Sequence, residues 1–276
     1  MRLAITESVM TNAFLDNMGN DFHTISRANL KSDAGYSVKE ASEQLLHCQC
    51  LVIIAPLNQS FSAEDEIKFV GCLLQAAKQV AIQKVVYISS IEVIATSSIT
   101  PVTELAVPSP TSKLGKVAYH CERLLVNTMQ HLPRTEYCLI RAAELYGQGV
   151  LSGTVTSVSR HCNKLPFVFS EGIANRRHYL NAASLVDLIS TCVTSEIERG
   201  EIFNAADSET VSTSQLYRHY TNKCKLIPVP KLAMFAVQVM RSRSDYLKSR
   251  FCDLEVDTSK ALRVLGWQSK SYFSQQ

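Results

Sequence analysis

The hydroxyl, carboxyl and phenol groups that could take part in catalysis gather around one apolar run and the segment that follows it. The run KVVYI ends in Ser89 and Ser90, and Glu92, Glu104 and Tyr119 come after it. A serine hydroxyl can orient a substrate hydroxyl or carbonyl, but the proton itself must be carried by a positioned acid or base. A tyrosine with a lysine four residues later would form such a pair, and the chain contains no YxxxK sequence.

Short apolar runs alternate with longer segments of helical periodicity, which indicates a parallel sheet covered by helices. Runs such as CLVIIA have no polar alternation, as expected of strands that are buried on both faces. The predicted strands are Arg2–Thr6, Phe22–Ser26, Cys50–Ala55, Lys84–Ser89 and Tyr137–Arg141, and the predicted crossover helices are Thr11–Met18, Ser37–His47, Ala63–Gln79 and Ser112–His131. Ligands of such a fold bind outside the carboxyl ends of the strands, so we expect the chemistry there.

The second half of the chain has a looser pattern. We expect a helix near residues 154–161, a turn-rich stretch over residues 164–180, and a helix over Ser184–Ile197 with Ser184 as its N-cap. A strand over Ile202–Asp207 and mostly helical structure should follow, with Gly266 ending the last helix. The predicted fold is α/β: residues 1–150 form a Rossmann-like, doubly wound parallel sheet, and residues 151–276 complete the sheet and form a small substrate-type lobe.

The composition, 46% hydrophobic and 19% charged over 276 residues, is that of a globular protein with a sizeable core. No apolar run approaches the roughly 18 residues of a membrane span. The first residues, MRLAITESVM, lack the cleavage site of a signal peptide, so a cytoplasmic location is expected.

Nine scattered cysteines and seven histidines show no metal-ligand spacing, so we expect buried free thiols and no metal site. The net charge of +3 is too small to indicate nucleic-acid binding. The basic residues Arg241, Arg243, Lys248 and Arg250 are expected on a solvated helix face.

Six segments carry a resemblance to a known family: KVVYISSIEVI, Glu104, PTSKLGKVAYHCE, LIRAAELYGQG, EGIANRRHYLNAASLVDLI and DTSKALRVLGW. In this order they resemble the extended short-chain dehydrogenase/reductase family, which includes nucleotide-sugar epimerases, dehydratases and reductases, over nearly the full length. The resemblance implies a Rossmann domain that binds NAD or NADP, with a Ser or Thr, a Tyr and a Lys acting at the nicotinamide. The tyrosine moves the proton, the lysine lowers its pKa and holds the ribose, and the hydroxyl residue orients the substrate.

Only part of this catalytic set has a counterpart in the chain. Ser90 matches the Ser/Thr position. Pro110, Gly115 and Glu122 match the frame of the family's catalytic helix, and that frame puts Leu114 at the tyrosine and Ala118 at the lysine. Neither side chain can transfer a proton or hold a ribose hydroxyl.

Neighbouring residues do not replace the missing pair. Tyr119 lies about 140° further round the helix than Leu114, and Lys116 lies on roughly the opposite face from Ala118. In the phosphate loop, the family's three glycines correspond to Glu7, Met10 and Ala13. A carboxylate repels a pyrophosphate and a methionine fills the space of a close backbone approach, whereas alanine is tolerable at the third position.

Other positions match cofactor-binding and substrate-binding residues of the family. Arg27 matches an arginine for the 2′-phosphate of NADP, or it is a solvated residue; Arg177 matches an arginine that grips a nucleotide-sugar phosphate, or it forms a surface salt bridge. Ser184 replaces an acidic residue. The predicted cofactor contacts are Arg27, Ala55, Pro56, Ser89 and Arg141, and the predicted substrate contacts are Tyr146 and Arg177, in loops that also serve packing.

These departures favour a catalytically degenerate family member, with no cofactor, that acts by binding. It would hold a nucleotide or nucleotide sugar, or act as a regulatory or partner subunit. The family commonly dimerises through the helices here expected at Ala63–Gln79 and Ser112–His131, which suggests a homodimer or a heterodimer with an active relative. No nucleic-acid or membrane partner is expected. The alternative is an NAD(P)-dependent epimerase, dehydratase or reductase that uses Ser90, Glu92, Glu104 or Tyr119 in an atypical site.

Overall fold

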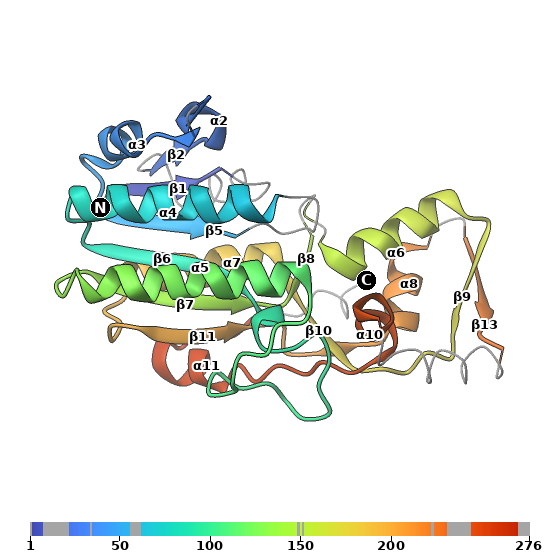
Figure 1. Cartoon of the computed structure of the whole chain (residues 1–276). Helices are drawn as coiled ribbons and strands as arrows, with labels where there is room; N and C mark the ends of the chain where they lie inside the picture. The colour runs from blue at the N-terminus through green and yellow to red at the C-terminus, as the bar shows by residue number, and fades with distance from the viewer. Residues whose placement is uncertain are drawn as a thin grey trace.

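Six parallel strands form the central sheet of the computed structural model (Figure 1). Their spatial order is β11 (Glu201–Ala205), β7 (Glu136–Ala142), β6 (Lys84–Ser90), β5 (Cys50–Ile54), β1 (Leu3–Thr6) and β2 (Phe22–Ile25). The structure describes residues 2–7, 22–33, 35–55, 62–147, 150, 152–221, 224–230 and 244–269. The chain runs from β1 to β2 on one side and then crosses to β5 on the other, so the topological switch point lies between β1 and β5.

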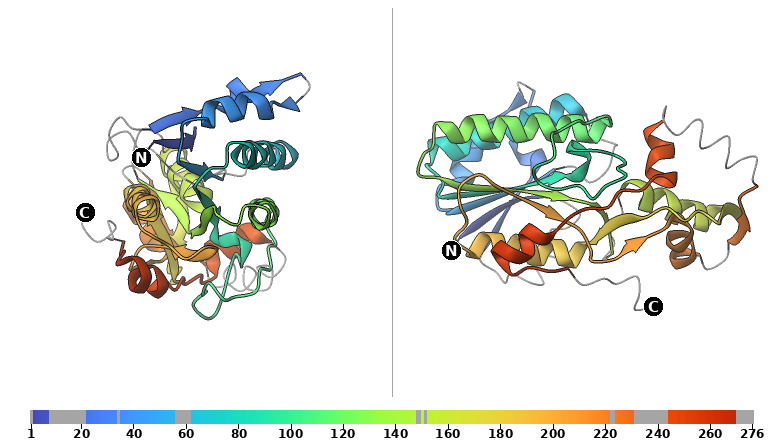
Figure 2. Two further views of the ribbon diagram at one scale, coloured as in Figure 1. Left: turned by 90° about the vertical axis from the view of Figure 1, so that its left-hand side faces the viewer. Right: turned by 90° about the horizontal axis from the view of Figure 1, so that it is seen from below.

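Helices cover both faces of this sheet (Figure 2). On one face, α3 (Val38–Leu45), α4 (Ala63–Gln79) and α5 (Lys113–Gln130) pack on strand residues such as Ala4, Leu51 and Tyr87. On the other face, α7 (Ala182–Thr194) and α11 (Ser259–Leu265) pack on the alternate residues of the same strands, such as Ile5, Val52 and Ile88. The inner strands, such as β5, therefore bury both of their sides, which accounts for their unbroken apolar sequence.

The smaller elements connect these layers and build a lobe at one end of the sheet. Between β2 and α3 lie α2 (Arg27–Leu30) and the short strands β3 (Lys31–Ser32) and β4 (Gly35–Tyr36). Beyond the carboxyl ends of the strands, the lobe contains α6 (Gly153–Lys164), α8 (Thr213–Tyr220), α10 (Asp245–Phe251), and the paired strands β9 (Phe167–Glu171) and β13 (Lys225–Pro228) (Figure 1). A three-stranded sheet has the order β12 (Thr210–Val211), β10 (Arg177–Asn181) and β8 (Glu144–Tyr146).

The predicted strands and crossover helices are confirmed to within one or two residues, except Thr11–Met18, which lies outside the described residues. The strand expected at Ile202–Asp207 is β11. Gly266 ends α11 with a φ of 65°, as expected of a left-handed C-cap. All nine cysteines are free thiols, and seven of them are buried.

Two predictions for the second half are wrong. The stretch over residues 164–180 contains β9 and most of β10 rather than turns alone. Helix α7 begins at Ala182, and its N-cap is Asn181, whose side chain accepts a hydrogen bond from the Ala183 amide at 2.9 Å. Ser184 is therefore not the cap: it lies inside the first turn because strand β10 runs directly into the helix.

Candidate functional site

The carboxylate of Glu122 on α5 holds the carboxyl ends of β6 and β7 together. It accepts a hydrogen bond from Ser89 Oγ at 2.6 Å and two from Arg141, from Nε at 3.1 Å and Nη2 at 2.8 Å. The Arg141 and Glu122 side chains are only 4% and 6% exposed. The structure thus brings together Ser89 and Arg141, two predicted cofactor contacts, and the polar atoms of both are bonded to Glu122.

Leu114 and Ala118 lie on the same stripe of α5 as Glu122, because the three residues are spaced by four. They are two turns and one turn closer to the start of the helix, and they are 8% and 2% exposed. Both side chains are hydrocarbon and carry no group that transfers a proton or binds a hydroxyl. Lys116 is exposed and Tyr119 partly exposed, so neither shares the buried position of this stripe.

Ser90 lies beside the start of α5. Its Oγ accepts a hydrogen bond from the Glu92 amide at 3.2 Å and caps the short 3-10 helix Ile91–Val93. The Glu92 carboxylate in turn accepts a hydrogen bond from Ser112, the N-cap of α5. Glu104 lies beside β11, and its Oε1 accepts a hydrogen bond from the Asn204 amide of that strand at 3.0 Å. The predicted polar candidates of the alternative enzyme therefore do not form one cluster.

The carboxyl ends of β1 and β5 meet at the switch point. Thr6 Oγ1 accepts a hydrogen bond from the Ile54 amide at 2.9 Å, and the Ala55 amide donates to the Ile88 carbonyl at 3.0 Å. Glu7, at the first glycine position of the family's phosphate loop, is exposed. A dinucleotide pyrophosphate approaching this strand end would meet a carboxylate. Met10, Ala13 and Pro56 lie outside the described residues.

Arg27 begins α2 directly after β2, and its guanidinium is paired within the protein. Its Nη2 lies 2.5 Å from Oε2 of Glu66, a residue in the first turn of α4 that is 1% exposed. The carboxylate of Glu66 raises the pKa of Arg27 although burial acts to lower it. Arg27 is therefore partly exposed to solvent and at the same time ion-paired with a buried carboxylate.

The two predicted substrate contacts lie in the lobe and also have partners in the chain. Tyr146 Oη donates to Asp207 Oδ2 at 2.5 Å, and burial raises the pKa of Asp207. Arg177 is 3% exposed, and its Nη1 donates to the carbonyls of Thr96 at 3.1 Å and Cys252 at 3.2 Å. The surface salt bridge considered for Arg177 is thus wrong, since its bonds are buried and go to backbone carbonyls.

The structure contradicts the exposed position predicted for Arg250. It was expected on a solvated helix face, but it is 7% exposed, and its Nη1 donates to Tyr217 Oη at 2.8 Å. Tyr217 also lies 3.0 Å from Nδ1 of His161 on α6. An arginine inside a basic run resembles a surface residue in sequence, and its burial depends on helices α6 and α8, which are distant in the chain.

A pocket of about 760 Å³ opens beside Asp207, between β10 and the segment that precedes α11. Its ionisable lining includes Arg176, His178, Glu209, Glu255 and Asp257. Among the described residues, no group of three or more His, Cys, Asp or Glu side chains is arranged to hold a metal ion. None of the described helices is both long and apolar enough to span a membrane.

Comparison with solved structures identifies close matches in fold. MoeE5, solved in complex with UDP-glucose and NAD, has a TM-score of 0.75 and 13% identity, with 98% of this chain and 94% of that chain covered. The UDP-N-acetylglucosamine 4-epimerase of Bacillus cereus has a TM-score of 0.75 and 15% identity, with coverage of 99% and 96%. The UDP-glucose 4-epimerase of Thermotoga maritima, solved with UDP-glucose, has a TM-score of 0.72 and 15% identity, with coverage of 100% and 96%.

The comparison by sequence gives the family. No curated protein matches the chain. The sequence model of the NAD dependent epimerase/dehydratase family matches residues 42–206, which is more than half of the chain and includes β5, β6, α5, β7 and β10. The chain therefore belongs to the NAD dependent epimerase/dehydratase family.

Proposed function

We propose that this chain is a catalytically degenerate member of its family, which has kept the fold and carries out no dinucleotide-dependent oxidation or reduction. The observation that carries the proposal is the buried stripe of α5. Glu122 keeps its bonds to Ser89 and Arg141, while Leu114 and Ala118 occupy the positions of the proton-transferring tyrosine and the ribose-binding lysine. The described residues therefore do not fit the reactive end of a nicotinamide dinucleotide.

The residues that would bind the adenosine and pyrophosphate of a dinucleotide do not favour binding either. The carboxylate of Glu7 opposes a pyrophosphate, and the guanidinium of Arg27 is paired with Glu66. The catalytic pair on α5 and two of the three phosphate-loop glycines are lost in separate segments, which is more simply explained by loss of the reaction than by an unusual mechanism.

In place of catalysis, the chain would act by binding. A nucleotide or nucleotide sugar is the ligand that the fold favours, because solved structures of the same fold contain UDP-sugars. A second role is that of a regulatory or structural subunit, paired through α4 and α5 with a copy of itself or with an active relative. Purification from the native cell as a free monomer would contradict this partner role.

An assay for turnover tests the proposal against the alternative of an NAD(P)-dependent epimerase, dehydratase or reductase with an atypical site. The purified chain is incubated with UDP-glucose, UDP-N-acetylglucosamine and UDP-glucuronic acid, with and without added NAD or NADP. The UDP-glucose 4-epimerase of Thermotoga maritima serves as the positive control for UDP-glucose. We expect no conversion of any sugar and no dinucleotide in an acid extract of the protein; turnover that requires NAD or NADP would establish the alternative.

A further inference from the structure

Arg27 occupies the position from which a Rossmann fold distinguishes NADP from NAD. It follows β2, twenty positions after Glu7 at the end of β1. A carboxylate at this strand end binds the ribose 2′-hydroxyl of NAD, and a nearby arginine accommodates the 2′-phosphate of NADP. The Arg27 side chain is 37% exposed, so it is partly accessible from solvent.

Glu66 holds this arginine from inside the protein. Its side chain is 1% exposed, and Oε2 lies 2.5 Å from Arg27 Nη2. Its other oxygen, Oε1, has no hydrogen-bond partner among the described residues, and Arg27 is the one cation that forms an ion pair with Glu66 there. If Arg27 turned toward a ligand, Glu66 would remain as a buried carboxylate without a partner.

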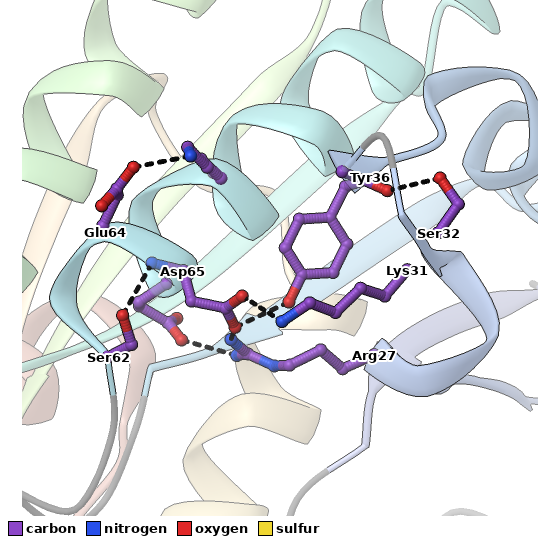
Figure 3. Close-up of polar contacts among 10 residues, drawn as sticks. Arg27, Lys31, Ser32, Tyr36, Ser62, Glu64 and Asp65 are labelled. Carbon is purple, nitrogen blue, oxygen red and sulfur yellow. Dashed lines mark hydrogen bonds and ion pairs between the residues drawn. The ribbon is translucent and has the colours of Figure 1, made fainter.

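The surroundings fix Arg27 in this position. Figure 3 shows Arg27, Lys31 and Tyr36 converging on Asp65 at the start of α4. Lys31 Nζ lies 2.6 Å from Asp65 Oδ1, Tyr36 Oη donates to Oδ2 at 2.7 Å, and Arg27 Nη1 lies 3.5 Å from the same oxygen. The guanidinium also lies 4.1 Å from the centre of the Phe69 ring.

The charges of this cluster balance within the protein. The cations Arg27 and Lys31 face the carboxylates Asp65 and Glu66, so the cluster offers no net positive charge to a phosphate group. A phosphate at this position would compete with a carboxylate that is already desolvated and bonded at short range. That competition is unfavourable unless Glu66 loses its charge.

We propose that Glu66 determines ligand selectivity at the carboxyl end of β2: by holding Arg27, it excludes nucleotides that carry a 2′-phosphate on adenosine. The claim goes beyond the proposed function, with which it shares only the Arg27–Glu66 pair, and it does not depend on Leu114 or Ala118. It would hold equally for a chain that bound NAD.

Binding of two small probes tests this. The probes are 2′,5′-ADP, which carries the 2′-phosphate, and 5′-AMP, which does not; calorimetry gives the ratio of their affinities. For the unmodified chain we expect 2′,5′-ADP to bind no more tightly than 5′-AMP. Glu66→Gln should release Arg27 and raise the ratio in favour of 2′,5′-ADP by about tenfold.

Glu64→Gln is the matched control. It removes the same charge from the same turn of α4, but Glu64 is exposed and paired with Lys68, so the ratio should not change. The proposal is overturned if Glu66→Gln shows no gain. It is equally overturned if the unmodified chain prefers 2′,5′-ADP and loses that preference in Arg27→Ala, because Arg27 would then bind phosphate despite Glu66.

A pH series on the unmodified chain and on Glu66→Gln gives a second test. Burial raises the pKa of Glu66, and Arg27 opposes this; the other titratable groups around Glu66 are Asp65 on α4, Tyr87 on β6 and Cys121 on α5. As the pH falls through this raised value, Glu66 becomes neutral and releases Arg27. The affinity ratio should then rise toward 2′,5′-ADP relative to the ratio in Glu66→Gln, in which the phosphates of the probes titrate but residue 66 does not. The same pH course in both proteins would contradict the proposal. Turnover with NAD would refute the proposed function and leave this result unaffected.

Discussion

The α-carbon of Gly115 packs directly against the main chain of Glu92. A Cβ atom at residue 115 would lie 2.2 Å from the Glu92 carbonyl oxygen and 2.8 Å from its carbonyl carbon. Glycine is therefore required here for α5 to approach the 3-10 helix that follows β6. This contact places the first turn of α5, with Leu114, beside the end of the strand that carries Ser89 and Ser90.

Substitution of Gly115 by alanine should destabilise the fold although alanine is the better helix former. The added methyl group meets rigid backbone, and we expect a loss of about 1–3 kcal/mol in the free energy of unfolding by urea titration. Gly71→Ala, inside α4, is the matched control because no atom lies within 4 Å of the added carbon. It should raise stability by about 0.4–1 kcal/mol. Equal effects of the two substitutions would contradict this packing.

Removing one partner of the buried Glu122–Arg141 pair should destabilise the fold. Glu122→Gln leaves a buried guanidinium without its counter-ion, and we expect a loss of about 3–5 kcal/mol in the free energy of unfolding. The exposed pair of Glu64 with Lys68 offers a control, since Glu64→Gln should leave the unfolding midpoint unchanged. Replacing both partners, with Glu122→Leu and Arg141→Met, should restore most of the loss; a double variant as unstable as Glu122→Gln would argue against the charge as its cause.

His178 should make stability depend on pH in the acidic range. Its Nδ1 accepts a hydrogen bond from the Val256 amide at 2.7 Å, and burial lowers its pKa. Because the folded value lies below the unfolded value of about 6.5, the unfolded chain binds the proton more readily. The stabilising contribution of neutral His178 is thus present above the unfolded value and is lost as the pH falls through the folded one.

His178→Asn keeps an acceptor for the Val256 amide and does not titrate. The difference in unfolding free energy between about pH 7.5 and about pH 5 should therefore be smaller in this variant than in the unmodified chain. His120→Asn, at an exposed position of α5, is the control and should leave the difference unchanged. An identical pH dependence in all three proteins would show that His178 does not contribute.

Restoring the family's residues should restore cofactor affinity. The variant combines Leu114→Tyr and Ala118→Lys with Glu7→Gly and Met10→Gly, so that it regains the proton-transfer pair and two glycines of the phosphate loop. We expect it to remain folded by circular dichroism and to bind NAD or NADP more tightly than the unmodified chain. A variant with only Leu114→Tyr and Ala118→Lys separates the two effects. A folded combined variant without any gain in affinity would contradict the positional match.

Much of the fold could be predicted because its signals are local. Runs such as CLVIIA are apolar on both faces, and the 17-residue helix α4 was placed with the same ends as in the structure. The errors arose where local signals competed. Ser184 has the chemistry of an N-cap, but Asn181 ends β10 and caps the helix three residues earlier. The strands β9 and β10 are short and lie in the lobe, next to the Gly and Asn residues of the loop between them, which favoured a prediction of turns.

The candidate site could be predicted only in its outline. The frame of Gly115 and Glu122 and the positions of Leu114 and Ala118 are visible in the sequence because they depend on spacing along one helix. The partners of the charged residues cannot be read from the sequence, because Glu66 lies 39 positions from Arg27 and Tyr217 lies 33 positions from Arg250. Such pairs are set by which helix covers which strand, and no local pattern encodes them.

The proposed loss of dinucleotide-dependent chemistry requires that the chain no longer binds NAD or NADP. Calorimetric titration of the unmodified chain with NAD and with NADP tests it most directly, because the family's chemistry cannot proceed without this hydride carrier. We expect no binding of either dinucleotide at micromolar concentrations. Affinity in the micromolar range or tighter for either one would contradict it.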